Sequence, residues 1–300
     1  MKRETILERF DNLRVWQRGD RRAVHKPLLI LFELGRILRG EPARIDYNIL
    51  EPKLMSLLEE FGPSGAAKSR HFPFWHLQTD GIWQLHGPEH ILNRPPGATP
   101  NISELRENHV TGEIVPEIRN ALQADTNLLA EVAQRLVSAH FPASIQQDVL
   151  NAVGLGCEVT GGEKSEKGRP RDPGFRERVL VAYERRCAVC GYDLRLDTHV
   201  IGLEAAHIKW FQAGGPDIEQ NGLALCALHH KIFDLGAFTI RPETYEIEFS
   251  RHVLGSRQIQ ERLLAYQGAG LIQPQSEDFL PDDQFLEWHR EEVFKKPARD

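Results

Sequence analysis

The chain has 300 residues, of which 41% are hydrophobic and 27% are charged, and its formal net charge is −6. These values are typical of a globular protein long enough for two domains, and the acidic balance argues against a protein that simply coats nucleic acid. No apolar stretch is long enough to cross a bilayer, and residues 1–16 mix acids and bases unlike a signal peptide, so we expect a cytoplasmic protein.

The N-terminal half has the pattern of a mainly helical domain with a small β-hairpin. The run "KPLLILFELGRILRG" is apolar enough for a buried helix that Gly40 stops, and Asp46 caps a further helix that ends at Gly62. The hairpin is expected in "HFPFWHLQTDGIWQL", where the turn-forming "TDG" separates two apolar runs. Further helices are expected over residues 1–16, 126–142 and 143–154.

Positive charge is concentrated at the N-terminus. Residues 1–44 contain eleven Lys and Arg against six Asp and Glu, which gives this segment a charge of +5. A local basic face can bind DNA phosphates even when the whole chain is acidic. A solvated helix face explains the same charges, so charge alone does not choose between the two interpretations.

The stretch "TGGEKSEKGRPRDPG", residues 160–174, separates the two halves. It is rich in glycine and charge, has two prolines and lacks large apolar side chains, which is typical of an exposed linker. We therefore predict an N-terminal domain over residues 1–158, a linker over 159–174 and a C-terminal domain over 175–300.

The C-terminal half begins with a predicted helix over 173–186 that runs into "CAVC". A strand-like segment over 199–210 follows, then a loop, a helix beginning near Gly222 and a hairpin formed by "AFTI" and "YEIEFS". The acidic tail after residue 276 contains a segment suited to a helix that packs on this domain.

Cysteine spacing predicts a metal cage. Cys187 and Cys190 form a CxxC pair, and Cys226 and His229 have the same spacing at a predicted helix start. Three sulfurs and one nitrogen are a common structural zinc set, and in a reducing compartment such grouping favours metal over disulfides. The alternative is that these are unrelated buried cysteines. Cys157 stands alone and is given no role.

A second metal site is suggested beside the cage. If His229 is a zinc ligand, its neighbour His230 points about 100° away on the helix. Asp234 lies one turn after His230 and therefore on the same face, so the pair is suited to a catalytic metal with open positions. Asp234 is also suited to capping the turn at "DLG".

Over residues 175–250 the chain resembles the HNH nucleases of the ββα-metal type. The matching stretches are "CAVC", "EAAHI", "GG", "NGLALC" and "HHKIFD" in that order, and the three namesake positions are His207, Asn221 and His230. The resemblance implies that His207 is the general base, that Asn221 holds the loop and that a divalent metal such as Mg²⁺ or Mn²⁺ binds at His230. An ordinary strand histidine is the alternative for His207.

One position departs from the family pattern. Many HNH nucleases carry a metal-binding acid or histidine immediately before the first histidine, whereas this chain has Ala206 there. The metal would then rely on His230 with help from Asp234 or Glu204.

The N-terminal half has a second resemblance. "HKPLLILFELGRI" followed by "HFPFWHLQTDGIW" is similar to the sulfur-binding domain of type IV restriction endonucleases, which bind phosphorothioate DNA. A phosphorothioate sulfur is larger and less strongly hydrated than oxygen, so an apolar cup favours it over an ordinary phosphate oxygen.

The segment "RHFPFWH" offers such a cup. The resemblance implies sulfur contacts from Phe72, Pro73 and His76, although relatives often have a small residue at the position of His76. Trp75 completes the apolar wall, while Phe74 is expected in the core. Contacts to phosphates or bases are expected from the polar residues of the two motifs: His25, Lys26, Arg70 and His71.

The sequence thus predicts an α+β protein with a mainly helical DNA-reading domain and a ββα-metal nuclease domain held by zinc. We expect an endonuclease directed by phosphorothioate-modified double-stranded DNA, and cutting both strands with one centre per chain favours a homodimer. Two alternatives are an HNH endonuclease directed to methylated or specific unmodified DNA, and a non-catalytic zinc-stabilised DNA-binding protein. A secreted toxin nuclease fits poorly, because the chain lacks a repeat-rich or translocation segment.

Overall fold

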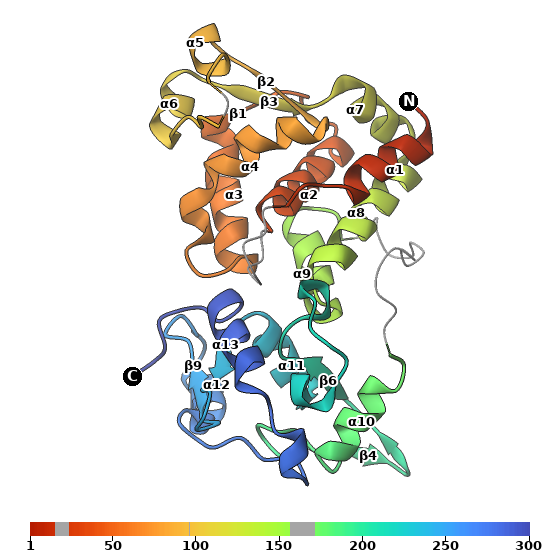
Figure 1. The fold of residues 1–300 in the computed structure, drawn as a ribbon, viewed down its shortest axis with the longest axis vertical. Helices are drawn as coiled ribbons and strands as arrows, with labels where there is room; N and C mark the ends of the chain where they lie inside the picture. Colours follow the sequence, from red (N-terminus) through yellow and green to blue (C-terminus); the bar gives the residue numbers. More distant parts are fainter. Residues whose placement is uncertain (16–23, 96, 157–171) are drawn as a thin grey trace. The chain divides into compact units, whose positions relative to one another are not determined.

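The computed structural model describes residues 1–15, 24–95, 97–156 and 172–300, and it divides the chain into two compact units, Met1–Lys167 and Gly168–Asp300 (Figure 1). Most of the predicted linker and Cys157 lie outside the described residues. Among the described residues, none of the helices combines the length and apolar character that spanning a membrane would require.

The N-terminal unit is built around one buried helix, α2 (His25–Leu38), which contacts α3 (Tyr47–Phe61), α4 (His71–His76), α7 (Pro116–Ala124) and α8 (Thr126–His140) (Figure 1). Its side chains are apolar on most faces, which is why neighbours cover it on several sides. The other helices of this unit are α1 (Arg3–Asp11), α5 (Glu89–Leu92), α6 (Ile102–Glu107) and α9 (Ala143–Ala152).

The helix ends follow local signals in the sequence. The Asp46 side chain accepts a hydrogen bond from the Asn48 backbone N–H and so caps α3, which ends before Gly62 as predicted. The helices predicted over 26–40, 126–142 and 143–154 are confirmed as α2, α8 and α9.

The small sheet of this unit differs from the predicted hairpin. Strands β1 (Ile45–Asp46), β3 (Thr111–Ile114) and β2 (Trp83–His86) form an antiparallel sheet in that order. The prediction of a hairpin over residues 71–85 is wrong, because α4 and a 3₁₀ turn (Leu77–Asp80) occupy residues 71–80. Pro73 lies in the first turn of α4, where a missing N–H costs no helical hydrogen bond. Gly81, with φ of +66°, ends that turn, and β2 pairs with β3 instead.

The C-terminal unit contains a ββα arrangement. Strands β6 (Leu203–His207) and β7 (Gly222–Cys226) pair antiparallel, and α11 (Ala227–Asp234) follows directly (Figure 1). The helix predicted from Gly222 therefore begins five residues later. The run "GLALC" is buried at every position, and a short apolar run of this kind fits a buried strand and a buried helix equally.

The remaining elements surround this motif. Helix α10 (Phe175–Ala182) contacts β6 and β7, and the predicted hairpin is confirmed as β8 (Phe238–Ile240) and β9 (Ile247–Phe249). The other elements of this unit are β4 (Arg195–Leu196), β5 (His199–Val200), α12 (Arg257–Leu263) and α13 (Asp283–Glu292). The predicted α+β class is confirmed in both units.

The acidic tail is anchored by α13, which packs on β8. The fully buried ring of His289 stacks on Phe233 with centroids 3.7 Å apart, and it bonds to Thr239 Oγ1 at 3.0 Å and to the Phe233 carbonyl oxygen at 3.1 Å. Burial lowers the pKa of His289 to about 4, so the ring is neutral at pH 7. The tail is therefore part of the unit that contains the ββα motif.

Candidate functional site

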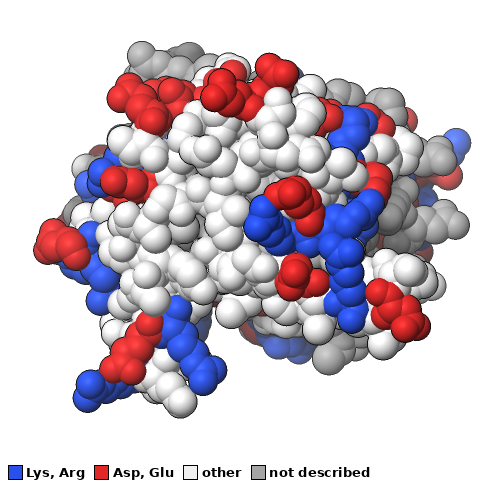
Figure 2. All heavy atoms as spheres, turned by 90° about the horizontal axis from the view of Figure 1, so that it is seen from below, with Lys and Arg blue, Asp and Glu red and all other residues white. Residues whose placement is uncertain are grey.

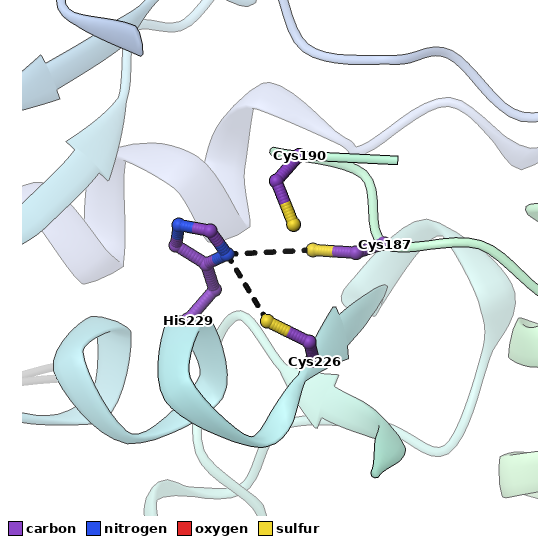
Figure 3. Close-up of side chains that lie close together, drawn as sticks. All are labelled: Cys187, Cys190, Cys226 and His229. Atoms are coloured by element: carbon purple, nitrogen blue, oxygen red, sulfur yellow. Dashed lines mark hydrogen bonds between the residues drawn. The ribbon is translucent and has the colours of Figure 1, made fainter. Parts of the chain in front are cut away.

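Four side chains meet as the predicted cage in the C-terminal unit. The candidate ligand atoms of Cys187, Cys190, Cys226 and His229 all lie within 4.8 Å of one another, and three of these residues are buried. His229 Nδ1 lies 3.2 Å from Cys226 Sγ and 3.6 Å from Cys187 Sγ (Figure 3). Within the described ranges, no second group of three His, Cys, Asp or Glu residues meets the same spacing.

Two short segments bring these donors together. Gly191 adopts φ of +71° and donates its N–H to the Cys187 carbonyl oxygen, which closes the tight turn between the first two cysteines. Ala188 donates its N–H to the Ala224 carbonyl oxygen in β7, so this turn is tied to the strand that ends in Cys226. Cys226 is the N-cap of α11 and places His229 in the first turn of the helix.

The electrostatics of the cluster suit a thiophilic cation. Cys190 hydrogen-bonds to Cys187, and this bond, with further bonds from Cys226 and His229, holds the pKa of the Cys187 thiol well below its usual range. The same contact raises the pKa of Cys190. Burial lowers the pKa of His229, but the contacts with the sulfur atoms of Cys187 and Cys226 outweigh it and raise the pKa to about 9. Three soft sulfurs and one imidazole nitrogen at this spacing fit a structural zinc ion.

His207 lies at the end of β6, where it pairs with Gly222 of β7. Its ring stacks on Phe175 of α10 with centroids 4.1 Å apart and planes 17° apart. Its Nε2 lies 2.7 Å from Asp217 Oδ1. The sequence interpretation missed Asp217; the only available signal was its place two residues after the "GG" pair in the loop between the strands.

Asn221 holds the two ends of that loop together. The side chain is fully buried; its Oδ1 accepts from the Lys209 N–H at 2.8 Å, and its Nδ2 donates to the carbonyl oxygens of Lys209 and Pro216 at 3.0 and 2.9 Å. The loop-holding geometry expected for Asn221 is present. Because the loop carries Asp217, Asn221 also fixes the group that contacts His207.

A methyl group at Gly215 should break this arrangement. It would lie 1.8 Å from the Lys209 carbonyl oxygen and 2.9 Å from Asn221 Nδ2. Gly215→Ala should therefore lower the free energy of unfolding of the C-terminal unit by about 3 kcal/mol, measured by denaturant titration. Gly214→Ala is the matched control, since Gly214 has φ of +81° but open space around it, and its cost should be about 1 kcal/mol. Equal losses for both variants would show that the Asn221 contacts contribute little.

His230 lies between two carboxylates. Its Nδ1 is 2.6 Å from Glu204 Oε2 on β6, and its Nε2 is 3.1 Å from Asp234 Oδ2 one turn later on α11. Burial lowers the pKa of His230, but Asp234 and Glu204 outweigh it and raise the pKa to about 10. The structure thus brings both candidate helpers to His230, whereas Ala206 is buried and offers no ligand atom.

The residues predicted to form a sulfur cup lie on α4. The rings of His71 and Phe72 have centroids 4.2 Å apart, and the Phe72 ring is 5.9 Å from that of His76. Phe72 is 43% exposed, and His76 Nε2 contacts Thr99 Oγ1 at 3.0 Å. Burial lowers the pKa of both His71 and His76, so both rings are neutral near pH 7.

The other cup residues lie deeper. Pro73 and Trp75 are buried, so they offer little surface to a ligand in this conformation. Phe74 is fully buried against Tyr47 and Trp83, which confirms its assignment to the core.

Three of the four polar side chains predicted to contact DNA from this domain have hydrogen-bond partners within the unit. Arg70 Nε donates to Glu51 at 2.7 Å, and Lys26 Nζ pairs with Asp80 at 2.5 Å. His25 Nε2 lies 3.0 Å from the Ala66 carbonyl oxygen. To contact DNA, these side chains would have to exchange or share their present partners.

Charges are interleaved over much of the surface. In the N-terminal segment, Arg3 pairs with Asp125 and Glu131, and Arg39 pairs with Glu41. On the face drawn in Figure 2, Lys and Arg lie beside Asp and Glu, and much of the surface carries neither. Residues 168–300 contain 17 Lys and Arg against 21 Asp and Glu, a net charge of −4. The C-terminal unit thus lacks the net positive charge of many DNA-binding domains.

Two family matches cover most of the chain. Residues 3–158 match the family described as "ScoMcrA-like, DNA sulfur-binding domain", and residues 187–241 match "HNH endonuclease". No match was found among curated proteins.

Several solved structures are similar to parts of the chain. The sulfur-binding domain of ScoMcrA complexed with phosphorothioated DNA has 21% identity and a TM-score of 0.46, over 51% of this chain and 98% of that one. The type IV phosphorothioation-dependent restriction endonuclease ScoMcrA has 22% identity and a TM-score of 0.44, over 55% of this chain and 35% of that one. The modification-dependent TagI restriction endonuclease has 24% identity and a TM-score of 0.30, over 41% and 39%.

Proposed function

Because this chain belongs to the family of ScoMcrA-like DNA sulfur-binding domains and also carries an HNH endonuclease domain, we propose that it is a restriction endonuclease directed by phosphorothioate-modified DNA. Both resemblances drawn from the sequence are confirmed by these matches. The observation that carries the proposal is that one chain combines a domain of the sulfur-binding family with an HNH centre whose residues lie in a ββα frame.

In the cleavage reaction, His207 is the general base that takes a proton from the attacking water. The water oxygen then bonds to phosphorus as the bond to the 3′ oxygen breaks. Asn221 keeps the β6–β7 loop closed, and the contacts of His207 with Phe175 and Asp217 fix its ring.

A divalent metal would be held by one ring nitrogen of His230 together with the carboxylate beside that nitrogen; Glu204 lies against Nδ1 and Asp234 against Nε2, on opposite edges of the ring. When bound, such a metal supplies positive charge that stabilises the scissile phosphate and the leaving oxygen. Glu204 lies two residues before Ala206 on the same strand, and we assign to it the ligand role that Ala206 cannot fill. Zinc is proposed at the cage formed by Cys187, Cys190, Cys226 and His229. There it would join the turn at residues 187–190 to β7 and α11.

The N-terminal unit would select the target. The exposed ring of Phe72, beside the rings of His71 and His76, offers an apolar surface for a sulfur atom. Pro73 and Trp75 lie buried in the same helix, and Arg70, which directly precedes it, is proposed to contact the DNA together with Lys26 and His25. The partner is double-stranded DNA, two chains are expected to act together on its two strands, and thiol ligands suit a reducing cytoplasm.

The deciding experiment compares two duplexes of identical sequence, one of which carries a phosphorothioate linkage, in buffer with Mg²⁺ or Mn²⁺. We expect the wild-type chain to bind and cut only the modified duplex. Equal binding and cutting of both duplexes would leave an HNH endonuclease with another target, and binding without cutting under every metal condition would favour a non-catalytic DNA-binding protein. Phe72→Ala should weaken binding to the modified duplex, whereas Met55→Ala, at another exposed apolar side chain of this unit, should not.

A further inference from the structure

We propose that Asp217 is a positioning residue that holds His207 in the tautomer and orientation needed to accept a proton from water. This inference rests on the proposed function, because it concerns how the nuclease centre works. None of the motifs through which the sequence resembles HNH nucleases includes Asp217, which lies in the loop between β6 and β7.

The contact between the two side chains is short and shielded. Asp217 Oδ1 lies 2.7 Å from His207 Nε2, and the side chains are only 10% and 17% exposed. A hydrogen bond with little water around it is stronger than one at the surface. A carboxylate can only accept, so Nε2 carries the proton and the lone pair of the neutral imidazole falls on Nδ1. Asp217 thereby selects which ring nitrogen acts as the base.

Asp217 is itself fixed by neighbouring groups. Its Oδ2 accepts from the Asp172 N–H at 2.8 Å, so both carboxylate oxygens are engaged. Arg178 Nη2 donates to the Asp217 carbonyl oxygen at 2.8 Å, while its Nη1 and Nε bind Asp172 and Glu219 at 2.7 and 2.8 Å. These contacts hold the loop backbone as well as the side chain.

The ring of His207 is also held by aromatic packing. Phe175 stacks against it at 4.1 Å, and Phe211 lies at 6.0 Å in a tilted arrangement. The packing around Phe175 is tight, because a Cβ at Gly222 would lie 2.4 Å from Val179 Cγ2 and 3.2 Å from Phe175 Cζ. The ring plane is therefore fixed by Phe175, and the rotation within that plane by Asp217.

This arrangement serves the proton-transfer step. As an O–H bond of water breaks, the proton joins His207 Nδ1 and the water oxygen bonds to phosphorus, while the 3′ oxygen leaves. The imidazolium that forms carries a positive charge beside the Asp217 carboxylate, which stabilises it. Asp217 touches neither water nor phosphate and acts only through His207.

The test is the pH dependence of single-turnover cleavage by Asp217→Asn. We expect the rate to fall about 100-fold while DNA binding and zinc content stay unchanged, since a neutral amide no longer selects the productive tautomer. We also expect the acid limb of the profile to move down by about one pH unit, because a nearby negative charge raises the pKa of a base. A purely structural role for Asp217 would leave the acid limb in place.

Asp172→Asn is the matched control. It removes a carboxylate from the same network without touching His207, and it should keep the wild-type acid limb. A wild-type rate for Asp217→Asn, or a slow rate with an unmoved acid limb, overturns the inference. If Asp217→Asn fails to fold, Asp217→Glu replaces it in the test, because glutamate keeps the negative charge. A shift of the acid limb of the pH profile in Asp217→Glu would then overturn the inference. If the wild type cuts no duplex at all, it is the proposed function that fails.

Discussion

His207→Ala should bind a phosphorothioate duplex as tightly as the wild type and cut it at least about 1,000-fold more slowly. The variant removes the only group assigned as general base, while the N-terminal unit that is proposed to select the DNA is untouched. The measurement is single-turnover cleavage with enzyme in excess, together with a binding titration on the same duplex. Thermal unfolding and zinc content show that the variant is folded.

His252→Ala is the control for that experiment. His252 is exposed in the same unit, and its Nε2 contacts the Lys296 carbonyl oxygen, away from the residues assigned to catalysis. It should cut at the wild-type rate. If His207→Ala also cuts at that rate while remaining folded, His207 is an ordinary strand histidine and the base must be sought elsewhere.

Cys187→Ala should abolish zinc binding and unfold the C-terminal unit. A structural zinc contributes about 10–16 kcal/mol of binding free energy to folding, which is comparable with the whole stability of a domain at about 5–15 kcal/mol. The cage joins the turn at residues 187–190 to β7 and α11, so its loss frees both the strand pair and the helix that carries His230. Zinc content by metal analysis should fall from one ion per chain to none, and cleavage should be lost.

The same experiment contains its own controls. Binding of the modified duplex should persist in Cys187→Ala, because the N-terminal unit forms a separate compact body. Cys157→Ser changes the one cysteine outside the cage and should keep zinc and cleavage. A Cys187→Ala chain that melts like the wild type would show that the four residues are merely neighbouring side chains.

Local signals predicted the elements whose ends depend on one or two residues. Asp46 caps α3 because its carboxylate needs only the N–H two positions on, and this can be read from the sequence. The hairpin expected over residues 71–85 failed for the opposite reason. Phe74 and Trp75 face the core from a helix, and the partner of β2 lies in β3, further along the chain.

In the candidate site, too, the contacts that depend on local spacing were predictable and those that depend on tertiary packing were not. The spacing of Cys187 and Cys190, and of Cys226 and His229, makes each pair able to grip one ion, and the cluster was predictable once two such pairs were found. The pairing of His230 with Asp234 follows from helix spacing, but the partner of His207 and the second partner of His230 were harder to predict. Asp217 and Glu204 reach these histidines only because β6, β7 and α11 pack together, and no spacing rule in the sequence expresses that contact.

The acidic C-terminal unit has a consequence for how the enzyme would spare ordinary DNA. Affinity for DNA of any sequence comes largely from Lys and Arg that displace counterions, and a unit with a net charge of −4 has little of this affinity. The effective concentration of phosphodiesters around such a unit is high enough for cutting only when the N-terminal domain of the same chain is already bound to the DNA. Cutting would then be limited to the neighbourhood of a modification by the weakness of the nuclease for DNA, without any need for a sequence preference in its active site.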